Sequence, residues 1–129
     1  MVIVSDGGDT TSFYKYQDAL DAAQKSDAVI YPIIVVPISN DAGRNIGGEH
    51  ALQQFASNTG GRVFFPSNFA ELDKAFSEIL LDLRTQYMVG YYPKELPKDA
   101  PRFHQVAVRV KRPDLRVSTR SGYYSDLVP

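Results

Sequence analysis

The residues best placed for chemistry lie in the stretch SDGGD, where Ser5, Asp6 and Asp9 follow a short apolar run at residues 2–4. An all-apolar run of this kind predicts a strand buried on both faces of a parallel sheet. A carboxylate at the carboxyl end of such a strand lies at the edge where open α/β sheets bind their ligands. Two roles are open for Asp6. It is a ligand of a hard cation such as Mg²⁺, or it only accepts hydrogen bonds from the amides of the two following glycines in a tight turn.

The rest of the sequence gives little support for catalysis. The stretch SDGGDT lacks the Gly-Lys-[Ser/Thr] ending of a P-loop, and Gly7-Gly8 alone does not make a dinucleotide fingerprint. The two histidines, His50 and His104, have no metal-ligand partner at a suitable spacing. The chain has no cysteine, which excludes disulfides and thiolate metal sites. We therefore expect no tightly bound cofactor and no enzymatic activity.

The charge is unevenly distributed along the 129 residues, which is a length typical of one domain. Residues 1–83 carry five Lys/Arg against 11 Asp/Glu, which is a net charge of −6. Residues 84–120 carry nine Lys/Arg against three Asp/Glu, which is a net charge of +6, so the charge of the whole chain is close to zero. This asymmetry indicates either two differently charged solvated surfaces or a basic face for an anionic partner. The basic residues form no dense cluster and no recognised motif accompanies them, so we expect no nucleic-acid binding.

Membrane insertion is not expected either. No apolar run approaches the roughly 18 to 20 residues that a spanning helix needs. The sequence as given also begins without the basic and apolar regions of a signal peptide. The cellular location therefore stays open at this stage.

The first two strands and the helix between them are predicted from apolar patterns. Ser12 or Thr11 is expected to cap a helix, and Phe13, Tyr16, Leu20 and Ala23 then line one of its sides at spacings of three and four. Residues 28–37, AVIYPIIVVP, form the clearest strand pattern. Pro32 has no N–H and does not suit the middle of a ladder, so we expect a bulge there or a nitrogen that faces an unpaired side.

Two further helices and a strand follow. Residues 38–48 read as a loop, residues 49–58 as a short helix ended by Gly60, and residues 62–65 as a strand. Asn68 and Glu71 begin the best defined helix, in which one apolar stripe is expected to face inward: Leu72, Ala75, Phe76, Ile79, Leu80 and Leu83. Residues 1–84 thus predict a βαβαβα unit, an α/β fold with a parallel sheet between two layers of helices.

The pattern changes to period two after Arg84. Val106, Val108 and Val110 share one face of a strand, and residues 112–115 suit a type I turn. These features predict an antiparallel β-hairpin over residues 103–120, with residues 86–92 as a third strand and residues 94–102 as an extended linker. We therefore expect residues 85–129 to form a C-terminal antiparallel β extension that packs on the 1–84 unit.

Several motifs in order resemble those of the von Willebrand factor A domain. They are IVSDGGDT, DAVIYPIIV, the segment from Ala56 to Pro66, and the amphipathic helix AELDKAF. The ending resembles a bacterial group of these domains in three places: LRTQYMVGYYP from Leu83 to Pro93, then Val106, Val108 and Lys111 to Pro113, and RSGYY from Arg120. The similarity covers nearly the whole chain.

The resemblance implies a three-layer, Rossmann-like fold with a metal-ion-dependent adhesion site built by three loops. Ser5-Asp6-Gly7 matches the third of these loops, so Asp6 is the expected residual metal ligand, with Ser5, Gly7 and Asp9 shaping a binding loop. The D-x-S-x-S motif of the first loop occurs nowhere in the sequence. The chain is therefore expected to correspond to the C-terminal half of such a domain, and to hold Mg²⁺ only if another chain supplies the other loops.

The function that this resemblance implies is a non-catalytic protein-interaction or adhesion module. The edge of the strand at residues 2–4 would be bare, so we expect a cover from a second copy of the chain, from the C-terminal strands folding back, or from a partner protein. Two alternatives stay open: a small Mg²⁺-dependent phosphoryl-transfer enzyme that uses Asp6 or Asp9, and an assembly piece that docks through tyrosines: Tyr87, Tyr91, Tyr92, Tyr123 and Tyr124. Relatives are often exported bacterial proteins.

Overall fold

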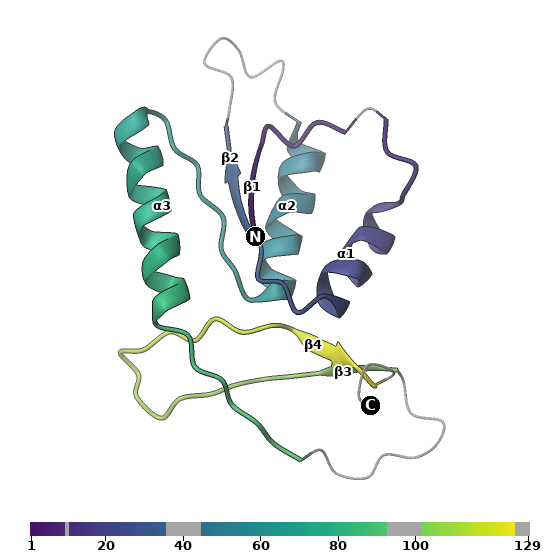
Figure 1. Cartoon of the computed structure of the whole chain (residues 1–129), viewed down its shortest axis with the longest axis vertical. Coiled ribbons are helices and arrows are strands. Elements are labelled where there is room, and N and C mark those ends of the chain that lie inside the picture. The colour runs from purple at the N-terminus through teal and green to yellow at the C-terminus, as the bar shows by residue number, and fades with distance from the viewer. Residues whose placement is uncertain (10, 36–44, 93–101, 126–129) are drawn as a thin grey trace.

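The computed structural model describes residues 1–9, 11–35, 45–92 and 102–125, and these residues form a mixed α/β fold (Figure 1). One sheet pairs β1 (Val2–Ser5) with β2 (Tyr31–Ile34) in parallel. The other pairs β3 (Phe103–Gln105) with β4 (Gly122–Tyr124) in antiparallel fashion. The helices of the described part are α1 (Tyr16–Lys25), α2 (Ile46–Thr59) and α3 (Phe69–Arg84). The expected α/β class with a C-terminal antiparallel pair is thus confirmed.

The pairing of β1 leaves one of its edges open in the described structure. Met1 O accepts a hydrogen bond from Tyr31 N at 2.8 Å, and Ser5 O accepts one from Val35 N at 3.0 Å. The polar groups of successive residues in a strand point to alternate sides. Since the groups of odd-numbered residues point at β2, the N–H and C=O groups of Val2 and Val4 point to the other edge. Among the described residues, β1 has no strand partner on that side.

The strand predicted at residues 62–65 is reduced to one parallel bridge between Ile33 and Phe64. Phe64 N donates to Pro32 O at 2.9 Å, and Ile34 N donates to Phe64 O at 2.8 Å. The nitrogen of Pro32 faces this same side and has no proton to donate, so the ladder cannot extend toward Arg62. The register between β1 and β2 is unbroken, so the bulge considered for Pro32 is absent. Its nitrogen faces the side that carries the single Phe64 bridge, not an unpaired side as the other alternative had it.

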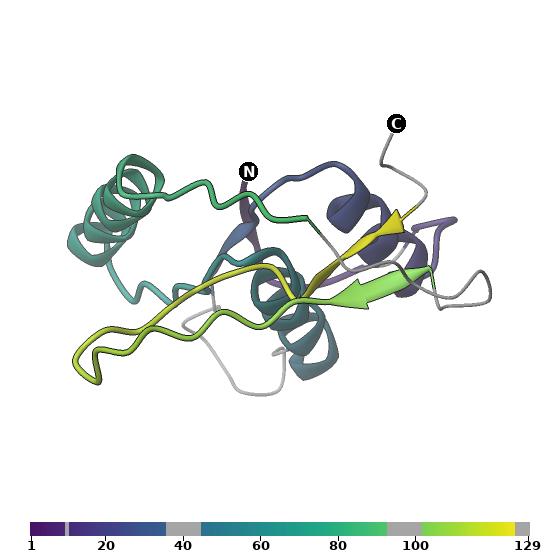
Figure 2. The same ribbon diagram turned by 90° about the horizontal axis from the view of Figure 1, so that it is seen from below.

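The helices pack on opposite faces of β2. Tyr31 and Ile33 face α3 and form a core with Ile79, while Ile30 and Ile34 point to the other face and are almost fully buried. Figure 2 shows α3 on one side of the sheet and α1 and α2 on the other. The all-apolar sequence of β2 is explained by this two-sided burial.

The first helix begins later than predicted. Asp9 Oδ1 accepts hydrogen bonds from Ser12 N at 3.1 Å and from Thr11 N at 3.3 Å, so the chain turns there and Ser12 caps no helix. The helix α1 begins only at Tyr16, where Asp18 Oδ2 accepts a hydrogen bond from Lys15 N at 3.0 Å. Phe13 lies outside the helix and is fully exposed, so its predicted inward position is wrong.

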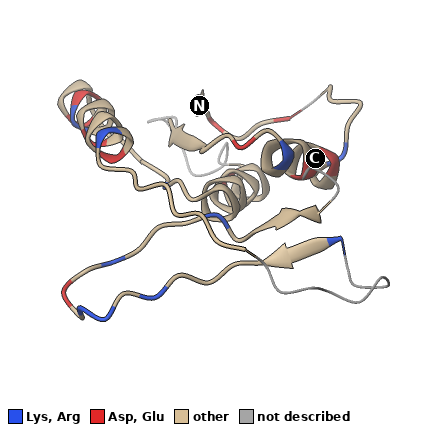
Figure 3. Cartoon of the chain, turned by 60° about the horizontal axis from the view of Figure 1, so that its bottom comes forward, with Lys and Arg blue, Asp and Glu red and all other residues tan. Residues whose placement is uncertain are grey.

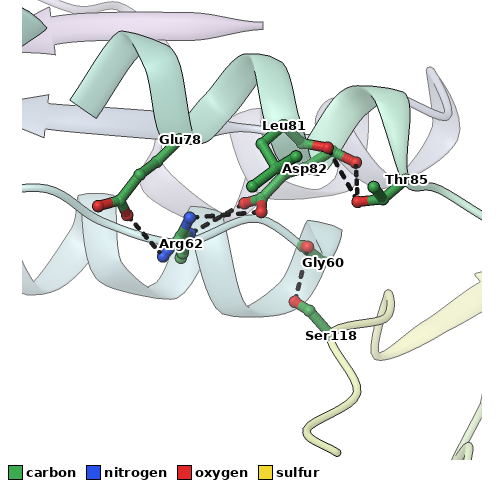
Figure 4. A network of polar contacts seen from close by, with 7 residues as sticks. All are labelled: Gly60, Arg62, Glu78, Leu81, Asp82, Thr85 and Ser118. Atoms are coloured by element: carbon green, nitrogen blue, oxygen red, sulfur yellow. Dashed lines mark hydrogen bonds and ion pairs between the residues drawn. The ribbon is translucent and has the colours of Figure 1, made fainter. Parts of the chain in front are cut away.

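The ends of α2 and α3 follow the predicted signals more closely. Gly60, with φ +85°, ends α2, although this helix begins at Ile46, inside the segment predicted as a loop. Asn68 begins α3 by accepting a hydrogen bond from Glu71 N at 2.9 Å. Arg62 ties α3 to the preceding segment through Glu78 at 3.0 Å and Asp82 at 2.9 Å (Figure 4).

The C-terminal segments differ most from prediction. Residues 86–92 are not a strand, because they pair with none of the described segments, and Tyr87, Met88 and Tyr92 are almost fully exposed. The predicted hairpin is paired only at its base and at its turn. The strands β3 and β4 form their own sheet, with Tyr124 Oη donating to Asp21 at 3.0 Å. The expectation that the C-terminal strands fold back on β1 is therefore wrong. The predicted linker lies outside the described residues except for Arg102.

Candidate functional site

The loop after β1 uses its own polar side chains to form a turn. Ser5 Oγ accepts a hydrogen bond from Gly7 N at 3.0 Å, and Asp6 Oδ1 accepts one from Gly8 N at 2.9 Å. Such Asx and Ser turns stabilise a sharp reversal at the end of a strand. Asp6 therefore has the turn role considered for it, but it accepts a hydrogen bond from the Gly8 amide alone, because the Gly7 amide donates to Ser5. Its side chain is otherwise exposed.

Asp9 is also engaged within its own loop. The hydroxyl of Ser12, and then the amides of Ser12 and Thr11, donate to its carboxylate and lower the pKa of Asp9 below its usual value. Hydrogen bonds of this kind favour the charged form of a carboxyl group. Asp9 is ionised at neutral pH, and its acceptor positions are directed at the turn between β1 and α1.

Gly7 allows this loop to pack tightly against the start of α2. Its φ is +84°, and a Cβ atom built on it would lie 2.8 Å from Glu49 N and from the carbonyl carbon of Gly48. Only glycine suits both the left-handed backbone and the close approach. On the helix side, Asn45 Oδ1 accepts a hydrogen bond from Gly48 N at 2.9 Å. The loop is therefore held by α2 as well as by its own side chains.

The described residues provide no ready metal centre around Asp6. No group of three or more His, Cys, Asp or Glu side chains in residues 1–9, 11–35, 45–92 and 102–125 has the arrangement of a metal site. His50 lies 3.5 Å from the side chain of Gln54, and His104 packs on the ring of Tyr123 with centroids 5.2 Å apart. A cation at Asp6 would thus need ligands from elsewhere.

A second feature of this region is an uncovered apolar surface, which we name the β1–α3 face. In the register with β2, Val2 and Val4 lie beside Tyr31 and Ile33 and so point to the same side of the sheet as α3. Val4 is nevertheless 57% exposed. The surface consists of two strand residues and three helix residues: Val2, Val4, Phe76, Leu80 and Leu83.

The helix residues of this face turn toward β1. Glu78 and Asp82 pair with Arg62 and so mark the flank of α3 on the Phe64 side of the sheet. At 100° per residue, Phe76 and Leu80 lie on the opposite flank, across the buried Ile79. Because β1 lies on the other side of β2 from Phe64, that flank is turned toward the β1 side of the sheet.

The sequence prediction placed all of this helical stripe inside, and that was wrong for three of its residues. Phe76, Leu80 and Leu83 are 42–54% exposed, while Ala75 and Ile79 are buried. The apolar pattern of α3 is wider than the strip of sheet beneath it, since β2 and Phe64 cover only one half. A stripe of six apolar positions on a surface helix was the available signal for this exposure.

Comparisons with known proteins leave the family open. No family model matches the chain, and no curated protein matches it either. A solved structure titled as an uncharacterized membrane-spanning protein from Vibrio fischeri is similar at 24% sequence identity and a TM-score of 0.49. The match covers 62% of this chain and 45% of that chain, so this chain spans less than half of that protein. None of the helices in the described residues combines the length and apolar character that crossing a bilayer requires.

Proposed function

We propose that this chain is a non-catalytic protein-interaction module that binds its partner through the β1–α3 face. The observation that carries the proposal is the coincidence of an open strand edge with uncovered apolar side chains. The open edge presents the N–H and C=O groups of Val2 and Val4, and the exposed flank of α3 lies on the side of the sheet to which the Val2 and Val4 side chains point. Exposed apolar patches beside an unpaired strand edge mark interaction sites.

The fold proposed for the completed module is a three-layer arrangement like that of a von Willebrand factor A domain. The parallel β1–β2 pair and the helices on both sides of β2 support this proposal. The motifs from Ser5 to Pro66 support it further. In this proposal the partner supplies the part of the sheet that would lie beyond β1.

The chemistry of the partner follows from the two halves of the face. A strand from the partner pairs with the outward groups of β1, which extends the sheet by β-augmentation. Apolar side chains of the partner then cover Val4 and the flank around Leu80. A second copy of this chain or a different protein would meet these requirements. Because an open edge beside apolar surface is prone to pairing, we expect a second copy to cover it when the chain is alone in solution.

Sedimentation velocity over a range of concentrations tests this proposal. We expect the chain to form a larger species through the β1–α3 face, and Val4→Lys to shift it toward monomer, because a charge on the face opposes burial. Val89→Lys is the matched control, since Val89 is 79% exposed in the segment after α3 and lies outside the face. A compact, stable monomer at every concentration, with β1 unpaired, would contradict the proposal.

A further inference from the structure

The β3–β4 hairpin continues beyond its paired base into an arm, which we define as residues 106–120. Val106 N donates to Ser121 O at 2.9 Å in the register set by β3 and β4, and the turn closes with Leu115 N donating to Arg112 O at 3.4 Å. The base and the turn are thus in the same register, although the described structure shows no ladder bonds between them. Continued along the arm, this register would bring the following residues opposite one another: Val108 and Thr119, Arg109 and Ser118, Val110 and Val117, Lys111 and Arg116.

The two faces of the arm differ in chemistry, because residues opposite one another share a face. The apolar face holds Val108, Val110, Leu115 and Val117, which are 42–50% exposed. The basic face holds Arg109, Lys111 and Arg116, all exposed. Figure 3 shows the basic residues spaced along both strands of the arm.

The basic face has charge without a counterpart in the described structure. Arg112 pairs with Asp114 in the turn, and Arg120 pairs with Asp27. Arg109, Lys111 and Arg116 form no ion pair with any residue that the structure describes. The arm thus presents cations that are available to an anionic partner.

The edges of the arm differ in their access. The return strand is bound near its base, where Ser121 N donates to Asn58 O at 3.1 Å and Ser118 Oγ donates to Gly60 O at 2.7 Å (Figure 4). Residues 107–111 of the outgoing strand make no backbone hydrogen bond within the described part of the chain. The backbone groups of residues 107–111 are therefore accessible to an added strand.

We propose that the arm binds an extended acidic segment of a partner protein by strand addition to residues 106–111. A strand added to an edge continues both faces of the ribbon. Its side chains must therefore alternate between apolar residues beside Val108 and Val110 and acidic residues beside Arg109 and Lys111. This charge complementarity identifies the partner as a segment with alternating apolar and acidic residues.

A second copy of this chain fits the arm less well than such a segment. The acidic residues of the first 83 positions lie on helices and in loops in the described structure, and β1, with its open edge, carries no acidic residue. The arm lies outside the β1–α3 face, so the inference adds a second surface to the proposed interaction module. Either surface can fail its test without the other.

Fluorescence anisotropy with a short synthetic peptide of alternating glutamate and valine tests the inference on the full chain. We expect saturable binding that weakens as salt rises, because ion pairs at an exposed surface are screened. A peptide of the same composition, with glutamates and valines in separate blocks, should bind at least about tenfold more weakly, since it cannot satisfy both faces.

Charge reversals on the basic face provide matched variants. Arg109→Glu should weaken binding about tenfold, because it replaces an attractive cross-strand pair by a repulsive one. Arg116→Glu makes the same charge change on the same face but on the other strand, so its effect should be clearly smaller. Circular dichroism checks that both variants keep the fold. If Arg109→Glu does not fold, Arg109→Gln replaces it in the binding measurement.

Several results would overturn the inference. Equal binding of the alternating and block peptides, or equal effects of the two reversals, would indicate a diffuse charge effect. No saturable binding of the alternating peptide would exclude the partner class. Binding to vesicles of anionic lipid but not to the peptide would assign the arm to a membrane surface, and loss of self-association in Arg109→Glu would assign it to a second copy.

Discussion

At the residue scale, the side chains that resemble a metal site are committed to the loop that carries them. Asp6 and Ser5 each accept a hydrogen bond from the amide of a following glycine, and Asp9 accepts hydrogen bonds from two further amides. A carboxylate that accepts one exposed hydrogen bond keeps acceptor positions, but a single exposed carboxylate is a poor site for Mg²⁺. The described residues bring no acidic cluster to Asp6.

We therefore predict that the chain alone binds Mg²⁺ negligibly. Isothermal titration calorimetry should show no saturable heat in the submillimolar range, either for the unmodified chain or for Asp6→Ala. Saturable submillimolar binding that Asp6→Ala abolishes, and that Asp9→Asn leaves in place, would contradict this prediction. It would show that further metal ligands lie around Asp6.

At the element scale, α3 is the helix on which the β1–α3 face depends, and its start is fixed by three side chains. Asn68 Oδ1 accepts from Glu71 N at 2.9 Å, while Glu71 Oε2 accepts from both Ser67 N and Ser67 Oγ at 2.8 Å. The bond to Asn68 satisfies one of the amides that the first turn of a helix leaves without a partner, and the bonds from Ser67 fix the residue before the cap.

Loss of this cap should destabilise the whole chain, because α3 contributes Ile79 to the core. Asn68→Ala is expected to lower the free energy of unfolding by about 1 kcal/mol. Urea unfolding followed by circular dichroism measures this change, and Ser77→Ala on the exposed side of the same helix is the control. Equal stability of Asn68→Ala and the unmodified chain would show that the cap has no effect.

The same cap should depend on pH. The amide and hydroxyl of Ser67 donate to Glu71 and lower its pKa below the usual value of 4.5. The stabilisation is therefore fully present above the pKa of the unfolded state and is lost as the pH falls through the lower pKa of the folded state. A carbon-detected NMR titration should place the midpoint of Glu71 below 4.5 in the unmodified chain and higher in Ser67→Ala. An unchanged midpoint in Ser67→Ala would be inconsistent with this assignment.

Elements with local signals were predictable from the sequence, and those that depend on distant partners were not. Asn68 and Gly60 mark helix ends through bonds within a few residues, and both were correctly assigned. Residues 86–92 alternate like a strand, but an alternating segment becomes a strand only when another strand pairs with it, and the fold brings none of the described segments to these residues. The outward flank of α3 was missed for a related reason: a pattern shows that Leu80 is apolar, not whether another element covers it.

The candidate site was predictable only in part. The sequence placed Asp6 correctly after a parallel strand, but it left the turn role and the ligand role open, because the neighbours of a loop are set by the fold. The contact of Gly7 with Gly48 illustrates this point, since it joins segments about 40 residues apart. The sequence also indicated a bare edge at residues 2–4, but not the helix that borders it.

At the scale of the whole molecule, the proposed assembly rests on two uncovered surfaces of different chemistry. Residues 1–83 carry a net negative charge and include the open edge of β1, and the arm carries exposed cations (Figure 3). Two surfaces of different chemistry on one small chain would let it join two segments of a partner, or two partners. The β1–α3 face is apolar and should contribute affinity, while the basic arm should contribute orientation and rate of association.

The central claim, that another protein surface covers the β1 edge, is tested most directly by hydrogen exchange at Val4. Its amide points away from β2, whereas the amide of Ser5 points toward it. In the associated chain we predict that NMR-detected exchange is slow at both amides, and that Leu80→Lys restores fast exchange at Val4 while Ser5 stays protected. Fast exchange at Val4 in the unmodified chain at every concentration, beside a protected Ser5, would contradict the claim.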